Sequence, residues 1–228
     1  MIMDFNLYFD CIYCINLPYR TDRLKAFKQN CLAILDTDNV QIFKAIDGKE
    51  VKNNTWQHNS GALGCRLSHL AIYKEALSKK YSKILVLEDD VVFKTNLKKK
   101  FNKLLEYIDD DWDMIYFGGT NYLQPTPINK HAVKLNGTLS THAIAINCKC
   151  LEKLILKIEH DQRWIDSVIG DLHAELKVYG FPKNIASQAK GYSDIQEASV
   201  NYNSSLYSKI SIQIKILVKT VINYIKQL

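Results

Sequence analysis

The chain has 228 residues, 47% of them hydrophobic and 24% charged, which is typical of one globular domain with or without a short appendage. Its 30 basic and 24 acidic residues give a net charge of +6, an excess that suits anionic substrates or surfaces but does not by itself indicate nucleic-acid binding. With no apolar run of about 18 residues and no secretory signal at the N-terminus, we expect a cytoplasmic protein with reduced cysteines.

Two pairs among the six cysteines have the close spacing of metal ligands, Cys11 with Cys14 and Cys148 with Cys150. Both pairs lie within apolar segments that are typical of strands rather than of turn-rich zinc knuckles. We therefore favour buried small hydrophobic residues over a zinc site at these pairs.

Strands and helices are predicted to alternate along the chain. In order, the predicted elements are a strand at 11–17, a helix at 24–35 capped by Thr21 or Asp22, a strand at 40–46, a loop at 53–64, a helix at 65–80, a strand at 83–87, a helix at 97–108, strands at 113–119 and 142–148, and a helix at 150–158. This order predicts an α/β fold with a mainly parallel central sheet flanked by helices. Ligands of such sheets bind beyond the carboxyl ends of the strands.

Residues 204–228 differ in composition from the rest of the chain. They contain four lysines and no acidic residue, and their apolar residues recur at helical spacing. This pattern predicts a basic amphipathic helix appended to a single domain at 1–203. Such a helix fits peripheral contact with a membrane surface, or packing on the domain or on a second subunit, and the sequence leaves these alternatives open.

Three adjacent carboxylates, Glu88, Asp89 and Asp90, follow the apolar strand at 83–87. On an extended backbone Glu88 and Asp90 would point to one side, and two carboxylates on one side suit Mg²⁺ or Mn²⁺ carrying a diphosphate. A solvated acidic turn is the alternative, but charges this close repel one another unless a cation or a basic group neutralises them. Arg20 and Arg23, just past the first strand, are suited to binding phosphate oxygens.

Several segments occur in a recognisable order. They are IYCINLPYRTDRLKAF, KAIDGKE, GALGCRLSHLAIYKEAL, ILVLEDDVVF and DMIYFGG. Together they make residues 10–195 resemble glycosyltransferase family 25, whose members include bacterial lipooligosaccharide galactosyltransferases and collagen hydroxylysine galactosyltransferase domains. The resemblance implies a GT-A type fold and an inverting transfer of a hexose, most often galactose and next glucose. It also implies a UDP-sugar donor and a divalent cation, Mn²⁺ or Mg²⁺.

The resemblance also implies roles for individual residues. The implied donor-binding residues are Asn16, Arg20, Arg23, Ala45, Asp47, Gly48, Gly64, Ser68, His69, Glu88 and Asp89. Asp90 is expected to bind the metal directly, with Glu88 as the second candidate ligand. Asp166 is the first candidate for the catalytic base, although a plain helix cap would look the same in sequence. Asp171 and Asp194 are the other candidates, and Asp194 also suits closure of the donor pocket or completion of the metal site.

Two other functions fit parts of the sequence. A sugar-phosphate nucleotidyltransferase would carry a glycine-rich phosphate loop after the first strand, and residues 17–23 contain no glycine. A catalytically degenerate domain that only binds a partner would have lost its metal motif, and Glu88, Asp89 and Asp90 are all present. The acceptor, a hydroxyl of a glycan, of a lipid-linked oligosaccharide or of hydroxylysine, is left open because loops decide specificity on a shared scaffold.

Overall fold

The computed structural model describes residues 4–35, 37, 39–52, 55–94, 96–195 and 198–200, so the helix predicted at 204–228 lies outside the described residues. The helices are α1 (Phe5–Tyr8), α2 (Thr21–Leu35), α3 (Ser60–Ser78), α4 (Leu97–Leu105), α5 (Leu151–His160) and α6 (Ile165–Asp171), with 3-10 turns at Cys148–Cys150 and Leu172–Ala174. Within this part of the chain, no helix has the length and apolar character needed to cross a membrane.

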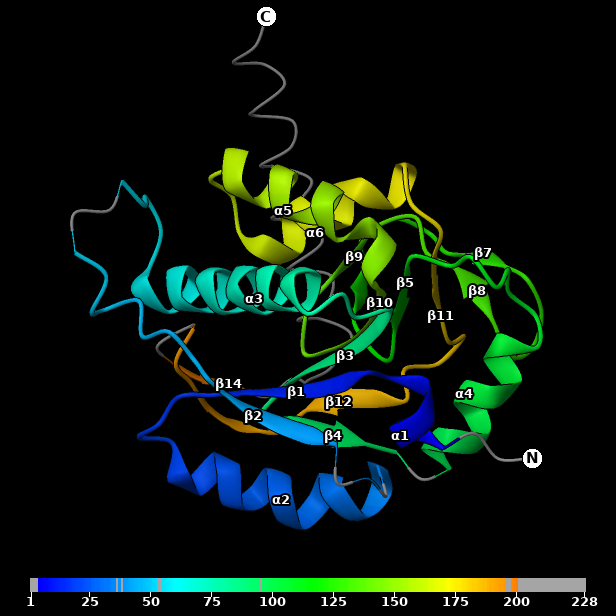
Figure 1. Ribbon diagram of the computed structural model, residues 1–228, viewed down its shortest axis with the longest axis horizontal. Helices are drawn as coiled ribbons and strands as arrows, with labels where there is room; N and C mark the ends of the chain where they lie inside the picture. The colour runs from blue at the N-terminus through cyan, green and yellow to red at the C-terminus, as the bar shows by residue number, and fades with distance from the viewer. Residues whose placement is uncertain are drawn as a thin grey trace, which may run out of the picture.

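An eight-stranded sheet forms the centre of the molecule, in the order β2-β1-β3-β10-β5-β11-β8-β7 (Figure 1). Its strands are β1 (Cys11–Asn16), β2 (Val40–Lys44), β3 (Lys83–Glu88), β5 (Met114–Tyr116), β7 (Thr126–Pro127), β8 (Val133–Lys134), β10 (Ala143–Asn147) and β11 (Val178–Gly180). Short strand pairs outside it are β4 (Val91–Phe93) with β12 (Ala186–Gln188), β6 (Thr120–Asn121) with β9 (Thr138–Leu139), and β13 (Gly191–Ser193) with β14 (Ala198–Val200).

The predicted α/β fold with a central sheet flanked by helices is confirmed, but the sheet is mixed rather than mainly parallel. Strands β2, β1 and β3 are parallel, whereas β10 runs antiparallel to both β3 and β5. A parallel neighbour needs a crossover connection, usually a helix. The chain between β5 and β10 forms only short strands, so it returns antiparallel. The start of β10 therefore lies beside the carboxyl end of β3.

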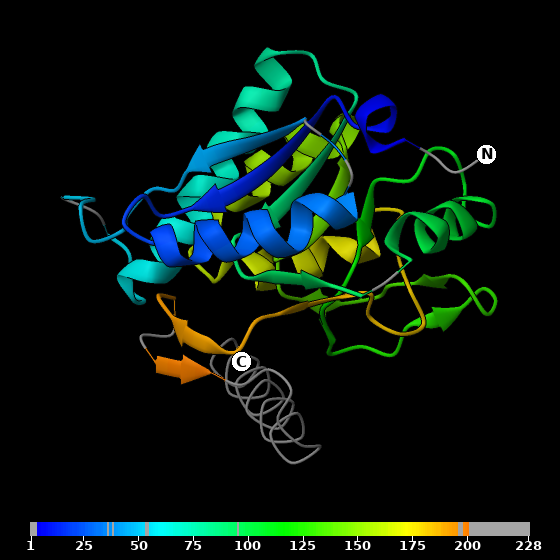
Figure 2. The ribbon, with the colours of Figure 1, turned by 90° about the horizontal axis from the view of Figure 1, so that it is seen from below.

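Both faces of the sheet are covered by helices, with α3, α5 and α6 on one face and α2 on the other (Figures 1 and 2). Along β1, residues Tyr13 and Ile15 pack into the core beneath α3, and Ile12 and Cys14 pack into the opposite core with residues of α2 and α4. All six residues of β1 are buried, as expected for a strand covered on both sides. The four cysteines of the two close pairs are likewise buried and unbridged, which confirms their interpretation as core residues.

Helix α3 begins at Ser60, so the predicted loop at 53–64 is wrong over its last five residues. The side chain of Asn59 caps the helix by accepting a hydrogen bond from the backbone N–H of Ala62 at 2.8 Å. Gly64 lies inside the helix because the backbone of 46–48 approaches it closely. A Cβ atom at Gly64 would lie 2.4 Å from the carbonyl oxygen of Ile46 and 2.8 Å from the nitrogen of Gly48.

Substitution of Gly64 by Ala is expected to lower the free energy of unfolding by about 1–3 kcal/mol, the usual cost of overpacking. The atoms that the methyl group meets belong to backbone, which cannot rotate away. Chemical denaturation would measure the loss, and Ser78→Ala at the exposed end of the same helix is the matched control. Equal stability of Gly64→Ala and the wild type would contradict the close approach.

Candidate active site

A pocket opens at the edge of the sheet where the parallel strands β1, β2 and β3 end. The predicted site residues that line it are Arg23, Ala45, Asp47, Gly48, Gly64, Ser68, His69, Glu88, Asp89, Asp90 and Asp194. Asn16 and Arg20 contact residues of its wall instead. The structure thus brings the donor-binding residues predicted from sequence to one place, as the position of a ligand site in an α/β sheet requires.

The three carboxylates do not continue the strand, because β3 ends at Glu88 and residues 89–90 form a turn into β4. The expectation that Glu88 and Asp90 share one side of an extended strand is therefore wrong. Both oxygens of Asp89 are already bonded, one to the Asn16 amide at 2.7 Å and the other to the Arg23 guanidinium at 2.9 Å. Asp89 thus fixes these two side chains, and each of its oxygens already accepts a hydrogen bond.

Asp90 is the carboxylate that suits a metal. It is 9% exposed, and its Oδ1 atom is buried without a hydrogen-bond partner among the described residues. Its Oδ2 atom lies 3.4 Å from Arg23. Burial, together with the charge of Glu88, raises the pKa of Asp90 to about 7. A buried carboxylate oxygen without a partner is costly, and a hard divalent cation would satisfy it, so the residues present fit the cation that the sequence resemblance implies.

Glu88 is held by side chains from distant parts of the sequence. Thr141, just before β10, donates its hydroxyl to Glu88 at 2.8 Å, and Gln188 of β12 donates its amide at 3.5 Å. Burial opposes ionisation of Glu88, but nearby His69 and His142 and the Thr141 hydroxyl more than offset it, so its pKa lies below the ordinary value. Glu88 is thus a fixed negative charge in the wall of the pocket.

Arg20 and Asp194 form an ion pair between the turn after β1 and the segment after β13. Arg20 also holds Asp22 through two hydrogen bonds of 3.0 and 2.9 Å. Arg20 pairs with two carboxylates but does not line the pocket, whereas Arg23 lines the pocket while it pairs with Asp89 and Asp90. Asp194 is accordingly bound as a counter-ion, which suits closure of the pocket better than proton abstraction.

Ser68 joins helix α3 to the loop at 45–48. Its hydroxyl donates to the carbonyl of Gly64 at 2.7 Å and accepts from the N–H of Ile46 at 2.9 Å. The side chain of Asp47 accepts from the N–H of Lys49 at 2.9 Å and turns this loop along the pocket rim. The loop therefore presents a fixed backbone surface to a ligand.

A second pocket adjoins the first and shares part of its wall. The shared residues are Cys65, Glu88, Gln188, Ser193 and Ile195. On its far side it is lined by Ser140, Trp164 and Asp166. The sequence motifs did not point to Ser140, Thr141 or Trp164, because these residues reach the site only through the antiparallel pairing of β10 and the packing of α6.

Asp166 lies in the first turn of α6, but it is not the helix cap, because Trp164 occupies that position. Its Oδ2 atom accepts a hydrogen bond of 3.2 Å from the N–H of Ser140, whose φ of 81° is a left-handed conformation that side chains disfavour. Burial raises the pKa of Asp166 above the ordinary value. Asp171, by contrast, is exposed and pairs with Arg163 at 2.6 Å. Asp166 is thus the base candidate that lines this pocket.

A family model described as glycosyltransferase family 25 (LPS biosynthesis protein) matches residues 9–160. Among curated relatives, mouse procollagen galactosyltransferase 2 is 35% identical over 133 residues, which are 48% of this chain and 21% of the relative. A mouse protein named inactive glycosyltransferase 25 family member 3 is 28% identical over 131 residues, 48% of this chain and 22% of its own. The chain therefore spans about a fifth of the length of these relatives.

Solved structures that are similar to this chain have low sequence identity to it. A Drosophila β-1,4-galactosyltransferase 7, solved with manganese, UDP-Gal and xylobiose, is 11% identical and has a TM-score of 0.45. The match covers 88% of this chain and 78% of that one.

Proposed function

The chain belongs to glycosyltransferase family 25, and from this premise we propose that it transfers a hexose from a UDP-sugar to a hydroxyl group of an acceptor, with inversion and with the help of a divalent cation. The observation that carries the proposal is the meeting of two pockets at Glu88, one containing the partnerless oxygen of Asp90 and the other containing Asp166. Two substrates that react directly with each other need two such adjoining pockets.

The first pocket suits a nucleotide-sugar donor. Its rim loop at 45–48 offers backbone and the Asp47 carboxylate to the uridine, and Arg23 offers a guanidinium to the diphosphate. Asp90, with Glu88 as a second oxygen donor, would hold Mn²⁺ or Mg²⁺, which neutralises charge on the leaving diphosphate. Galactose is the first candidate sugar and glucose the second.

The second pocket suits the acceptor and its deprotonation. In the proposed reaction the acceptor oxygen forms a bond to the anomeric carbon from the face opposite the diphosphate, and the bond from that carbon to the diphosphate oxygen breaks. Asp166 takes the hydroxyl proton in the same step. The carboxylate suits this role because the Ser140 N–H fixes it in place and burial has raised its pKa toward the working range.

Trp164 gives the acceptor pocket an aromatic wall. The indole lines the pocket and lies 6.1 Å, between ring centroids, from the exposed His58 ring. Flat apolar rings beside polar groups are the usual means of orienting a ligand that has both apolar and hydroxyl surfaces. A glycan hydroxyl, as in lipopolysaccharide biosynthesis, is therefore the first candidate acceptor, and hydroxylysine is the second.

Replacement of Trp164 by Ala is expected to raise the KM for the acceptor about tenfold, because the aromatic contact is worth on the order of 1 kcal/mol beyond its buried area. The Kd for UDP should not change, since Trp164 does not line the donor pocket. Steady-state kinetics would measure the first quantity and calorimetry the second. Trp164→Phe is the matched control, and an unchanged acceptor KM in the Ala variant would remove Trp164 from the acceptor site.

The proposed activity is tested first by calorimetric binding of UDP with and without Mn²⁺, followed by hydrolysis of a panel of UDP-sugars. Tighter binding in the presence of Mn²⁺, with slow hydrolysis of one sugar, would support a transferase and identify its donor. Binding without any turnover would favour a catalytically inactive domain, as the name of one relative describes. No binding in either condition would refute the proposed donor class.

A further inference from the structure

A cluster of three different metal-ligating groups lies on the wall shared by the two pockets. The Cys65 thiol, the His69 imidazole and the Glu88 carboxylate each offer one ligand atom, and these atoms lie within 4.8 Å of one another. We propose that Cys65, His69 and Glu88 form a binding site for a borderline-soft divalent cation, with Zn²⁺ as the preferred ion; this site shares Glu88 with the all-oxygen site at Asp90 and differs from it in its thiol and imidazole ligands. This proposal does not depend on the transferase activity.

The spacing of the two helical ligands suits a shared ion. Cys65 and His69 lie four positions apart in helix α3, so their side chains project from the same face. The end of β3 places the Glu88 carboxylate opposite that face, with Glu88 Oε1 3.8 Å from His69 Nε2. Paired ligands at this helical spacing, completed by a third group from another element, are a common way of building a zinc site.

On the side that faces the cluster, the imidazole of His69 lies at ion-pair distance from Glu88 but makes no hydrogen bond to a described residue. It is fully buried, and its Nε2 atom has no hydrogen-bond partner among the described residues. Its Nδ1 atom lies 3.4 Å from the Tyr73 hydroxyl, and when Nδ1 carries the proton that contact leaves the lone pair of Nε2 directed toward Glu88. When Nε2 is protonated, His69 instead faces Glu88 as an ion-pair partner at 3.8 Å and lowers the pKa of Glu88, and a cation bound between the two groups would take the place of that proton.

The distances agree with a tetrahedral ion after a small adjustment. Zinc binds nitrogen and oxygen at about 2.0–2.2 Å and sulfur at about 2.3 Å, so neighbouring ligand atoms lie roughly 3.3–3.6 Å apart. The separation of 3.8 Å between His69 and Glu88 is close to this value. The longest separation within the cluster, at most 4.8 Å, must shorten by about 1 Å.

The ligand set selects the metal. Thiolate and imidazole favour zinc over magnesium or manganese, whereas the oxygen of Asp90 has the opposite preference. On binding, the Cys65 thiol loses its proton and its sulfur forms the bond to the metal. The three protein ligands leave a fourth position for water or a substrate oxygen, an arrangement typical of open rather than structural zinc sites. Because Glu88 also belongs to the donor pocket, zinc here should weaken the binding of UDP with Mn²⁺.

The test uses Co²⁺ as a spectroscopic substitute for zinc in the full-length, metal-free protein. We expect one equivalent of Co²⁺ to produce visible bands of four-coordinate intensity and a sulfur-to-cobalt charge-transfer band, both removed by Zn²⁺. Cys65→Ser should abolish the charge-transfer band and weaken Zn²⁺ binding at least about 100-fold. Removal of a group that only hydrogen-bonds a metal ligand weakens binding less than this. The matched control is Cys148→Ser, because Cys148 is buried and lines neither pocket. This variant should retain both the charge-transfer band and the binding of Zn²⁺.

Two results would overturn the proposal. One is a weak six-coordinate cobalt spectrum without the charge-transfer band in the wild type, and the other is full retention of that band in Cys65→Ser. If Cys65→Ser does not fold, X-ray absorption of the zinc-loaded wild type decides the question. One sulfur with two or more nitrogen and oxygen neighbours supports the site, and a shell without sulfur refutes it.

Discussion

Replacement of Asp90 by Asn is expected to reduce turnover by about a thousandfold or more without unfolding the protein. The substitution keeps the shape of the side chain but removes the charge that would hold the divalent cation, and such a cation stabilises the leaving diphosphate by several kcal/mol. Each 1.36 kcal/mol corresponds to a tenfold change in rate. Calorimetry should show that Mn²⁺ no longer tightens the binding of UDP.

The stability of the metal-free Asp90→Asn protein separates this loss from misfolding. Burial and Glu88 raise the pKa of Asp90 to about 7, so the stability that its protonated form contributes is complete below its unfolded pKa of about 3.9. That contribution is lost as the pH rises through about 7. A neutral Asn avoids this loss, and the variant should therefore unfold at the same temperature as the wild type or higher at pH 8.

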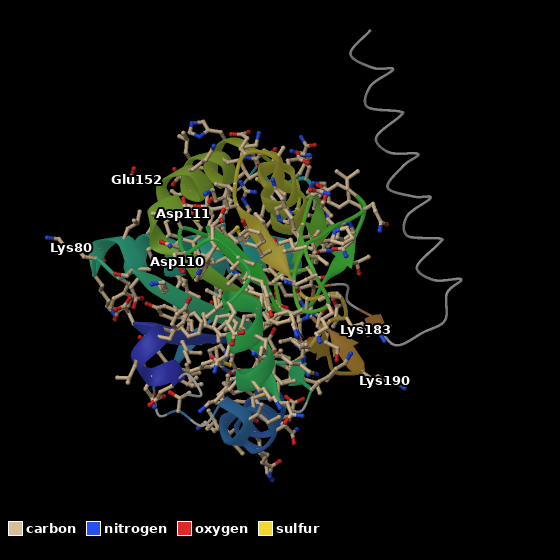
Figure 3. All side chains as sticks on the ribbon, turned by 90° about the vertical axis from the view of Figure 1, so that its right-hand side faces the viewer. Lys80, Asp110, Asp111, Glu152, Lys183 and Lys190 are labelled. Atoms are coloured by element: carbon tan, nitrogen blue, oxygen red, sulfur yellow. The ribbon has the colours of Figure 1, made fainter. Side chains whose placement is uncertain are left out.

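The effect of Mn²⁺ on the unfolding temperature also distinguishes the wild type from Asp90→Asn. It should raise the unfolding temperature of the wild type but not that of Asp90→Asn, because a ligand that binds only the folded state stabilises it. Asp110→Asn, which alters an exposed carboxylate that lines neither pocket (labelled in Figure 3), is the matched control and should respond to Mn²⁺ as the wild type does. Unchanged Mn²⁺-dependent turnover in Asp90→Asn would refute the assignment of the metal to Asp90.

The parts of the fold that the sequence predicts well depend on local patterns. Strands β1 and β3 could be predicted from their continuous apolar runs, because strands covered on both faces need such runs. The start of α3 was missed because Gly61 and Gly64 have the composition of a loop. They are glycines because neighbouring backbone leaves no room for a Cβ atom. That crowding is tertiary and has no local signal, whereas Asn59 as the helix cap was a local signal that could have been read.

The parts of the site that the sequence could not predict depend on long-range pairing. Asp89 and Asp90 look alike in sequence, but each oxygen of Asp89 accepts a hydrogen bond from Asn16 or Arg23, whereas one oxygen of Asp90 has no hydrogen-bond partner in the part of the chain that the structure describes. Thr141 reaches Glu88 only because β10 is antiparallel, so that its start meets the end of β3. A motif can therefore locate the three carboxylates, but only the surrounding contacts separate a fixed counter-ion from a free ligand.

Replacement of Asp166 by Asn is expected to lower kcat by about 10² to 10⁴, the usual contribution of a positioned base, while the Kd for UDP stays unchanged. Asn can still accept the hydrogen bond from Ser140, so the local structure should persist. Single-turnover rates and donor calorimetry would measure the two quantities. Asp171→Asn is the matched control, because Asp171 pairs with Arg163 on the surface and lines neither pocket.

The pH dependence of the reaction tests whether Asp166 acts as the base. A base must be ionised, and burial raises the pKa of Asp166, so kcat should fall on acidification with a midpoint above the ordinary Asp value of about 3.9. At a Mn²⁺ concentration that saturates the site and so keeps Asp90 ionised, the acidic limb should disappear in Asp166→Asn, leaving a low rate that is independent of pH in this range. If the limb persists in Asp166→Asn but is lost in Asp194→Asn, the base is Asp194, and the ion pair with Arg20 must open during the reaction.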